Sequence, residues 1–498
     1  MNFKYLFSVI TAALEGVLFS GLIFGWTSIS YVFKNEGYFQ PDIDNFTQVC
    51  GGNSTSLPDE CKYQELSLVL VFTIGSFILS ISTLPNGVVF DKFGTLVARS
   101  IGTLFFTLGC VLIAISDASA AWILYPAMCC ISVGGIILLV TNMPLGNLFP
   151  TVRSSLITLF NGSLDSSSVI FLLVKIAYDS GFRVQTIFTF IAACSVFQWV
   201  RSFLFMPRMH IPFNIPKAGI KLGVIEGLCK ATVEEEAAAP NQQEMKLLNG
   251  SKQADEEVEK KEVDVMTFID CIRTVDFWMN VFHFSLLQLR NYIFLSTSPI
   301  WLKSVLGDDP DGDLFSKYIN AFGICQFFGI FCAPLNGILV DTMLKICKKS
   351  NSEQTAIRKS IAMSLFTTTM LAALFSLAVC VPNAAFQYVS FILQVVFRSF
   401  LYGGNASFIA LLYPGQHFGT LYGVTMIVGG IVSLLQFPLS KIAVNLCGGD
   451  FLPLNISFIA ISLFTLIHPI TLFFKARKLE KCLLNKDGNN IMPNEVVA

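Results

Sequence analysis

Leu84-Pro-Asn-Gly-Val-Val-Phe-Asp91 and Pro334-Leu-Asn-Gly-Ile-Leu-Val-Asp341 are two copies of one short motif, with their Asn, Gly and Asp positions in register. The first copy ends the second long apolar run of the chain, and the second copy ends the eighth. A motif that returns after six runs predicts two parallel six-helix repeats around a central cavity.

The first copy continues past Asp91 with Lys92, Phe and Gly94, and Arg99 follows. A glycine such as Gly87 lets helices approach closely, and an aspartate can cap a helix or pair with basic groups. We expect these residues and the second-copy aspartate to form a cytoplasmic gate, although a tight turn is the plain alternative. The gate candidates are Gly87, Asp91, Lys92, Arg99 and Asp341.

Two further basic residues occupy matching places at the starts of apolar runs. Arg153 follows Phe149-Pro150, and His417 follows Tyr413-Pro414. We expect both side chains to lie at gates.

The composition places the chain in a membrane. Of its 498 residues, 53% are hydrophobic and only 13% are charged, and the mean hydropathy is +0.64. Soluble proteins carry about 25% charged residues, so most of this surface must face lipid. Nucleic-acid binding is also excluded, because 33 basic residues are balanced by 34 acidic ones and leave no basic stripe.

Twelve apolar runs reach the length of about 20 residues that spans a bilayer. The sequence therefore predicts an all-α polytopic membrane protein with six helices on each side of a polar segment. The runs are 5–33, 66–89, 96–116, 120–146, 154–178, 183–205, 275–302, 315–343, 360–381, 386–412, 418–440 and 451–474.

The polar segment 209–266 is rich in Glu and Lys and has almost no aromatic residues, which favours a flexible linker. It divides the chain into an N-terminal half, 1–208, and a C-terminal half, 267–476, followed by a tail, 477–498. Lys and Arg concentrate in the short loops on the side of the termini. By the positive-inside rule, both termini and the linker are predicted to be cytoplasmic, in a plasma-membrane protein.

The same orientation puts the loop 34–64 outside. This loop carries two glycosylation sequons, at Asn45 and Asn53, and a cysteine pair, Cys50 and Cys61. We expect sugar on these asparagines and a disulfide between these cysteines, because an external loop meets oxidising conditions.

Three charged residues are predicted at the middle of the bilayer. Counted from the helix ends at 1.5 Å per residue, Glu15, Asp165 and Arg398 all reach a depth of roughly 15 to 18 Å. Intramembrane charges usually face a cavity, so three charges at one depth predict one site. The plain alternative is a structural ion pair of Arg398 with Glu15 or Asp165.

Helical spacing adds uncharged polar residues to this candidate site. Gln394, Arg398 and Tyr402 follow at i, i+4 and i+8, with Asn405 three residues further on, so they share one helix face. Asn161 and Asp165 share a face in the same way. On the seventh helix, Gln288 and Arg290 are two residues apart and cannot both point inward. Candidate stacking partners are Phe160, Tyr402 and Phe408.

An enzyme is not expected. The apolar helices carry no nucleophile beside a base near an interface, and the four histidines include no pair at ligand spacing. We therefore expect no cofactor and no metal, no obligate protein partner, and only the bilayer and a small molecule as binding partners.

Several stretches resemble solute carrier family 43 of the major facilitator superfamily, and the resemblance covers nearly the whole chain. They are 25–39 (GWTSISYVFKNEGYF), 161–168 (NGSLDSSS), 398–408 (RSFLYGGNASF), 417–423 (HFGTLYG) and 433–438 (SLLQFP). The resemblance implies the major facilitator fold.

The family includes carriers of large neutral amino acids and an equilibrative carrier of purine nucleobases. At Glu15 and Arg398 the sequence resembles both branches of the family. At Asn161, Asp165 and the run 402–405 it resembles the nucleobase branch. In one departure, Gln-Leu-Arg at 288–290 is closer to the amino-acid branch.

The resemblance implies facilitated, sodium-independent transport of purine nucleobases such as adenine, guanine and hypoxanthine by alternating access. A flat, neutral purine needs an aromatic wall, a few amides and an acceptor carboxylate, which the candidate residues supply. Transport of large neutral amino acids is the alternative.

Overall fold

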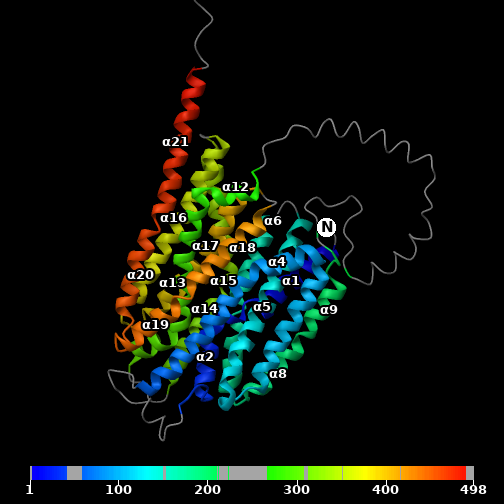
Figure 1. The fold of residues 1–498 in the computed structure, drawn as a ribbon, viewed down its shortest axis with the longest axis vertical. Coiled ribbons are helices and arrows are strands. Elements are labelled where there is room, and N and C mark those ends of the chain that lie inside the picture. Colours follow the sequence, from blue (N-terminus) through cyan, green and yellow to red (C-terminus); the bar gives the residue numbers. More distant parts are fainter. Residues whose placement is uncertain are drawn as a thin grey trace, which may run out of the picture.

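The computed structural model describes residues 3–41, 59–149, 153–209, 211, 223, 266–307, 312–349, 352–414 and 417–489. All regular secondary structure in these ranges is helical, and the helices run side by side as a tilted bundle (Figure 1). The beginning of α1 and the end of α21 lie at the same end of the bundle (Figure 1). We name this the terminal end, and the opposite end the loop end.

Twelve membrane crossings account for the described helices. Nine helices are long and apolar enough to span a bilayer, and a bent pair, Lys4–Ser20 with Leu22–Asn35, makes a tenth. Helix α4 (Asp59–Ile115) contains two of the predicted runs because the chain turns at Gly94, where φ is +82°. The more polar α13 (Val275–Leu306) completes the predicted twelve.

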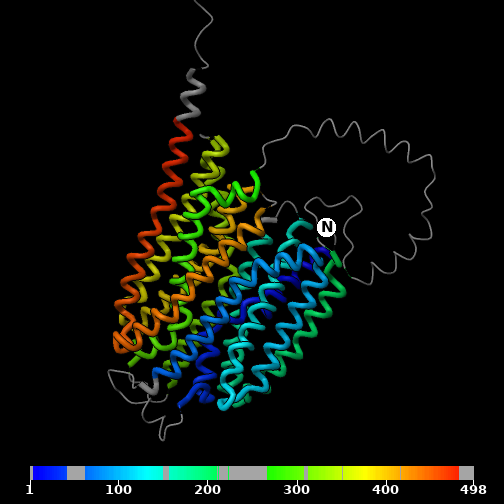
Figure 2. Tube along the Cα trace, in the orientation of Figure 1, coloured from blue at the N-terminus to red at the C-terminus, as the bar shows by residue number. Residues whose placement is uncertain are grey.

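The helices of the N-terminal half are shown in blue to green in Figure 2. They are α1 (Phe3–Glu15), a π-helical turn (Gly16–Ser20), a 3-10 turn (Leu22–Gly25), α2 (Trp26–Asn35), α4, a 3-10 segment (Ala118–Ile123), α5 (Leu124–Asn142), a second 3-10 segment (Met143–Leu148), α6 (Arg153–Ser166), α7 (Val169–Asp179), α8 (Val184–Cys194) and α9 (Val196–Leu204).

The helices of the C-terminal half follow in green to red (Figure 2). They are α12 (Phe268–Arg273), α13, α14 (Asp313–Phe327), α15 (Gly329–Lys348), α16 (Glu353–Val379), α17 (Gln387–Leu412), α18 (Phe418–Ser433), α19 (Gln436–Asn445), α20 (Leu452–Phe464) and α21 (Ile467–Asn489).

Six of the described crossings that the sequence predicts as single runs are interrupted. The sixth, eleventh and twelfth are interrupted at Ser195, Leu434 and Thr465, and the other three interruptions lie in the first, fifth and eighth crossings. The first bends by 52° at Gly21, the fifth is interrupted at Ser167 and Ser168, between α6 and α7, and the eighth at Phe328, between α14 and α15. At Gly21 a Cβ atom would lie 2.3 Å from the backbone oxygen of Leu164. The bend therefore depends on glycine, because no larger residue fits against α6 there.

The two halves meet along several helix pairs, among them α2 with α13. Helix α4 of the first half packs against α18 of the second, and α6 packs against α15. The bundle is therefore two six-helix groups with a shared interface, as the repeated motif predicts.

The boundaries of the predicted domains stay predictions. Almost all of the predicted linker 209–266 falls outside the described residues. The last helix is longer than predicted, because α21 continues past 476 to Asn489.

Candidate functional site

A cavity of about 280 Å³ opens between the two halves. Its deep part is lined by Phe24, Asp165 and Tyr402, near the middle of the bundle. Gly87 and Asp91 of α4 also line it, near the terminal end. The cavity therefore leads from the buried polar residues to the terminal end.

Asp165 and Arg398 meet at the deep end of this cavity. Oδ1 of Asp165 lies 2.7 Å from Nη2 of Arg398, and both side chains are buried. The guanidinium of Arg398 also lies over the ring of Phe24, 3.8 Å from its centroid. Because Asp165 and Phe24 belong to the first half and Arg398 to the second, one buried cation connects the halves. The sequence left this pairing open, and Asp165 is the partner.

A chain of amides extends from Arg398 into the second half. Nη1 of Arg398 donates to Oε1 of Gln326 at 3.2 Å. Gln326 donates to Gln394 at 2.7 Å, and Gln394 donates to Asn291 at 2.8 Å. Gln394 therefore supports Arg398 rather than lining the cavity. Gln326 and Asn291 are not among the residues predicted from the sequence, because neither lies at helical spacing from Asp165 or Arg398.

The other polar candidates divide between the cavity and the helix packing. Asn161 and Tyr402 line the cavity, and Tyr402 donates to the hydroxyl of Tyr292 at 3.3 Å. Asn405 instead accepts a hydrogen bond of 2.7 Å from Asn280, between α17 and α13. Of the helix face that spacing predicts, Tyr402 lines the cavity and Arg398 pairs with Asp165 at its deep end. Gln394 and Asn405 form their hydrogen bonds within the second half.

Two of the three predicted stacking residues do not reach the cavity. Phe160 is buried in the helix packing, and Phe408 packs against Tyr413. Phe24, Phe418 and Tyr422 line the cavity beside Tyr402 instead. A Phe-rich sequence offers aromatic residues on every helix face, so spacing alone cannot select these rings.

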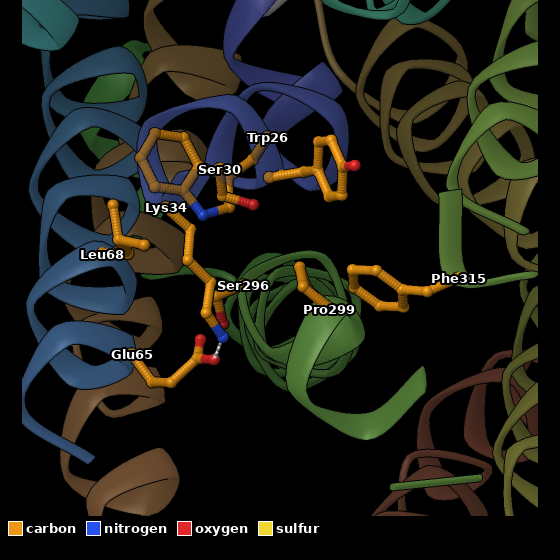
Figure 3. Close-up of a pocket in the computed structure, with 9 residues that line it drawn as sticks. Trp26, Ser30, Lys34, Glu65, Leu68, Ser296, Pro299 and Phe315 are labelled. Atoms are coloured by element: carbon orange, nitrogen blue, oxygen red, sulfur yellow. Dashed lines mark hydrogen bonds and ion pairs between the residues drawn. The ribbon is translucent and has the colours of Figure 1, made fainter. Parts of the chain in front are cut away.

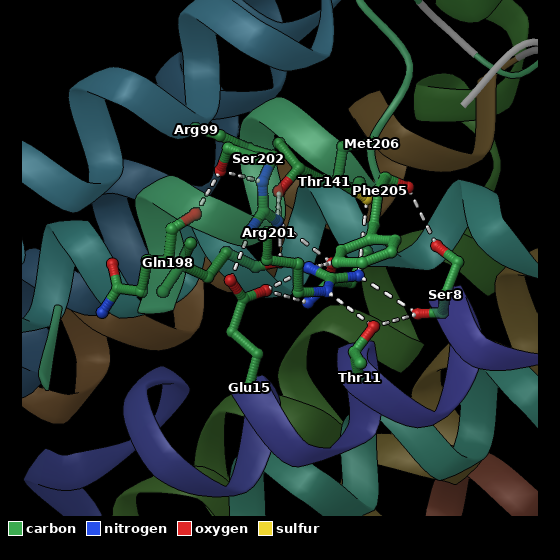
Figure 4. Close-up of polar contacts among 12 residues, drawn as sticks. Ser8, Thr11, Glu15, Arg99, Thr141, Gln198, Arg201, Ser202, Phe205 and Met206 are labelled. Carbon is green, nitrogen blue, oxygen red and sulfur yellow. Dashed lines mark hydrogen bonds and ion pairs between the residues drawn. The ribbon is translucent and has the colours of Figure 1, made fainter. Parts of the chain in front are cut away.

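Glu15 does not share a site with Asp165 and Arg398, contrary to the expectation from depth. Its carboxylate forms ion pairs with Arg99 and Arg201, all three side chains being buried. Asn142 donates to Oε2 of Glu15 at 3.0 Å and accepts from Arg201 at 2.8 Å. Figure 4 shows how this cluster joins α1, α4 and α9.

The Glu15 cluster also changes the interpretation of Arg99. The sequence predicts Arg99 at the gate, but its guanidinium is buried and donates to Ser202 at 2.8 Å. Arg201 is not among the residues predicted from the sequence, because it lies close to the end of its apolar run. Because Arg99 and Arg201 both pair with Glu15, the partners of Glu15 belong to its own half of the bundle.

The remaining gate candidates lie at the terminal end. Lys92 and Asp341 are exposed there, and the ring of His417 packs 6.1 Å from that of Phe268. No atom lies within 4 Å of a Cβ built on Gly87, so the close approach predicted at this glycine is absent here. The side chain of Arg153 lies outside the described residues.

Contacts between the halves close the loop end. The hydroxyls of Thr27 and Ser298 lie 2.7 Å apart, between the first and seventh crossings. Lys175 donates to Ser316 at 2.6 Å, between the fifth and eighth crossings. The structure therefore has its deep cavity accessible from the terminal end and its loop end sealed.

An ion pair lies beside this seal. Lys34 and Glu65 pair between α2 and α4, next to Ser296 and Pro299 of α13 (Figure 3). The small pocket between them holds about 20 Å³, which is too little for a solute larger than water.

The predicted modifications lie outside the described residues. Asn45, Asn53 and Cys50 fall in the undescribed segment, and so does the side chain of Cys61. Glycosylation and the disulfide therefore stay predictions.

Comparison with known proteins identifies the family. The profile of the Major Facilitator Superfamily matches residues 59–437. The chain is 37% identical over 472 residues to equilibrative nucleobase transporter 1 of Bos taurus, covering 93% of this chain and 94% of that one. It is 27% identical to the large neutral amino acids transporter small subunit 3 of Homo sapiens, covering 95% and 93%.

Solved structures agree on the fold. A mutant of the nucleoside transporter NupG superposes with a TM-score of 0.54 at 12% identity, covering 94% of this chain and 100% of that one. A POT family transporter in complex with 5-aminolevulinic acid superposes with a TM-score of 0.56 at 15% identity, covering 91% of this chain and 95% of that one. The family profile and the 37% identical transporter, together with the twelve crossings, show that the chain is a multi-pass membrane transporter. The chain belongs to the major facilitator superfamily and, within it, to solute carrier family 43, as its sequence motifs predict.

Proposed function

We propose that this transporter carries purine nucleobases such as adenine, guanine and hypoxanthine down their gradients, without sodium, by alternating access. The observation that carries the proposal is the ion pair at the deep end of the cavity. Asp165 and Arg398 neutralise each other, and aromatic residues lie around them. Such a site suits a flat, neutral solute with several N–H groups and ring acceptors.

The polar atoms around the pair fit a purine edge. Asp165 and Asn161 offer oxygen acceptors to the N–H groups of a base, and both line the cavity together with Tyr402. The 37% identity to a nucleobase transporter over almost the whole chain supports the same solute class.

Transport of large neutral amino acids is the second candidate. At Gln288 and Arg290 the sequence resembles the amino-acid branch of the family. A relative at 27% identity is named as a transporter of large neutral amino acids. However, Arg290 donates to Ser376 at 2.8 Å and lies over the ring of Phe375, whereas Gln288 donates to Ser80. Neither residue lines the cavity, so neither offers a charge to a zwitterion there.

The orientation belongs to the same proposal. With the terminal end in the cytoplasm of a plasma-membrane protein, the described state is open to the cytoplasm, and exposed basic residues such as Lys92 and Lys348 lie on the expected side. The gate would then close over Gly87 and Asp91 as the halves rock. The proposed mechanism uses no cofactor and no covalent chemistry.

Paired uptake assays test the proposal. Cells that express the chain should accumulate labelled adenine faster than control cells, equally with sodium or choline in the medium, and labelled leucine no faster. Accumulation of leucine without adenine would establish the second candidate instead, and a requirement for sodium would contradict facilitated flux.

A further inference from the structure

Two interrupted helices face each other across the boundary between the halves. The fifth crossing is interrupted just after Ser166, and the eighth at Phe328. The two helices are in close contact here, because a Cβ atom on Gly162 would lie 2.8 Å from that of Ala333, and one on Gly329 would lie 3.0 Å from that of Asp165. The crossing point is therefore level with the ion pair of Asp165 and Arg398.

The hydroxyl of Ser166 bridges the interruption in the eighth crossing. It donates to the backbone oxygen of Phe327 at 2.6 Å and accepts from the backbone N–H of Ile330 at 2.9 Å. Both backbone groups flank Phe328, where α14 ends and α15 begins. Inside a bilayer each such group needs a partner, and here one side chain of the opposite half supplies both.

The next serine serves the first crossing in the same manner. Oγ of Ser167 accepts from the backbone N–H of Gly21 at 2.7 Å, at the bend between the two parts of that crossing. Ser167 acts within its own half, whereas Ser166 acts between the halves. Two consecutive hydroxyls of the fifth crossing thus satisfy two different helix interruptions.

Gln326 connects this bridge with the ion pair. In a regular α-helix, the N–H of Ile330 would bond to the backbone oxygen of Gln326, four residues earlier. Ser166 replaces that bond at the interruption of the eighth crossing. The side chain of Gln326 accepts from Arg398, so closing of the interruption would move the partner of Arg398.

We propose that Ser166 is a positioning residue for transport, acting through the interruption of the eighth crossing, about which the two halves rotate. This inference rests on the proposed alternating-access function, but it does not depend on which solute is carried. Ser166 is not proposed to touch the solute, since it does not line the cavity.

Ser166→Ala tests the role, with Ser163→Ala as the matched control. Ser163 lies one turn earlier on α6, is also buried, and donates only within its helix, to Leu159 at 2.9 Å. Uptake is measured over a range of adenine and of leucine concentrations, and rates are divided by the amount of protein at the cell surface. Ser166→Thr, which keeps the hydroxyl, is the rescue variant.

We expect Ser166→Ala to lower the maximal rate per molecule by about five- to tenfold, the effect of losing one or two buried hydrogen bonds. The half-saturating concentration should change less than about twofold, and both Ser163→Ala and Ser166→Thr should retain most of the rate.

A rate of Ser166→Ala equal to that of Ser163→Ala would overturn the role, and so would equal losses in Ser166→Ala and Ser166→Thr. A loss seen only in surface amount would show a folding role instead. If the unmodified chain carries leucine and not adenine, the proposed solute is wrong, and the comparison of the variants is then made with leucine.

Discussion

Asp165 of α6 and Arg398 of α17 form an ion pair of 2.7 Å that joins the two halves of the bundle beside the cavity. The pair is buried, so either charge alone would be costly at this depth. It therefore has two roles that experiments can separate, binding of solute and attachment of one half to the other.

Asp165→Asn should weaken the binding of adenine. The substitution keeps the shape but replaces one acceptor oxygen with a donor, which leaves an unsatisfied polar group and costs about 1 to 3 kcal/mol, or roughly ten- to hundredfold in affinity. Asp165→Ala should be worse. Competition binding or the half-saturating concentration of uptake measures the change.

The double variant Asp165→Asn with Arg398→Gln separates the two roles. If Asp165 only balances Arg398, the single variant loses surface expression together with transport, and the double variant recovers part of both. If Asp165 binds solute, the single variant reaches the surface and the second change restores nothing. Normal adenine affinity in Asp165→Asn would exclude the binding role.

Glu15→Gln should destabilise the protein without a specific effect on affinity. It leaves Arg99 and Arg201 buried without their carboxylate, and removing one partner of a buried pair costs about 3 to 5 kcal/mol. We expect a lower melting temperature in detergent and less protein at the surface. Glu353→Gln, which breaks an exposed pair with Lys348, should change neither.

A disulfide between Thr27→Cys and Ser298→Cys should stop transport. The two hydroxyls lie 2.7 Å apart across the sealed loop end, which is close enough for a disulfide after substitution. Oxidation should abolish uptake and a reductant should restore it. Each single variant serves as a control, and continued uptake by the oxidised double variant would show that this end need not open.

Asp91→Ala should lower the maximal rate more than the affinity. Asp91 lines the cavity near the terminal end, away from the ion pair, so it can act on closure without touching bound solute. We expect a loss of severalfold in rate. Asp341→Ala is the comparison, because this repeat equivalent does not line the cavity and should have a smaller effect. A change confined to affinity would place Asp91 in the binding site.

Glycosidase treatment tests the orientation. If the loop 34–64 is external, the protein should carry sugar at Asn45 or Asn53 and gain mobility on a gel after treatment. The double variant Asn45→Gln with Asn53→Gln should already migrate at the faster position. Unchanged mobility of the unmodified protein would contradict the predicted topology.

The sequence predicts the fold well because its strongest signals are local. Apolar runs give the crossings, and the motif at 84–91 and 334–341 gives the two repeats. Depth, counted along each helix, correctly brings Asp165 and Arg398 together. It fails for Glu15, because depth says nothing about the direction in which a side chain leaves its helix.

The interruptions at Gly21, Ser167 and Phe328 could not be predicted in the same way. Apolar residues continue across Gly21 and Phe328, and the serines 166–168 lie inside a longer apolar run. A hydropathy profile responds to composition and not to backbone hydrogen bonds. At Gly21 and Phe328 the deciding contacts are tertiary, namely the serine hydroxyls of a neighbouring helix that satisfy the released backbone groups. These two interruptions are thus encoded by pairs of residues on different helices.

Helix α21 rises beyond the other helices at the terminal end (Figure 1). An ion pair of 3.0 Å between Glu480 and Lys359 anchors it to α16. From Glu480 to its end at Asn489 the helix continues for nine residues, about 14 Å at 1.5 Å per residue. A fluorescent protein fused after this stalk would start clear of the cavity mouth, so a C-terminal reporter can follow the carrier without obstructing the solute's exit.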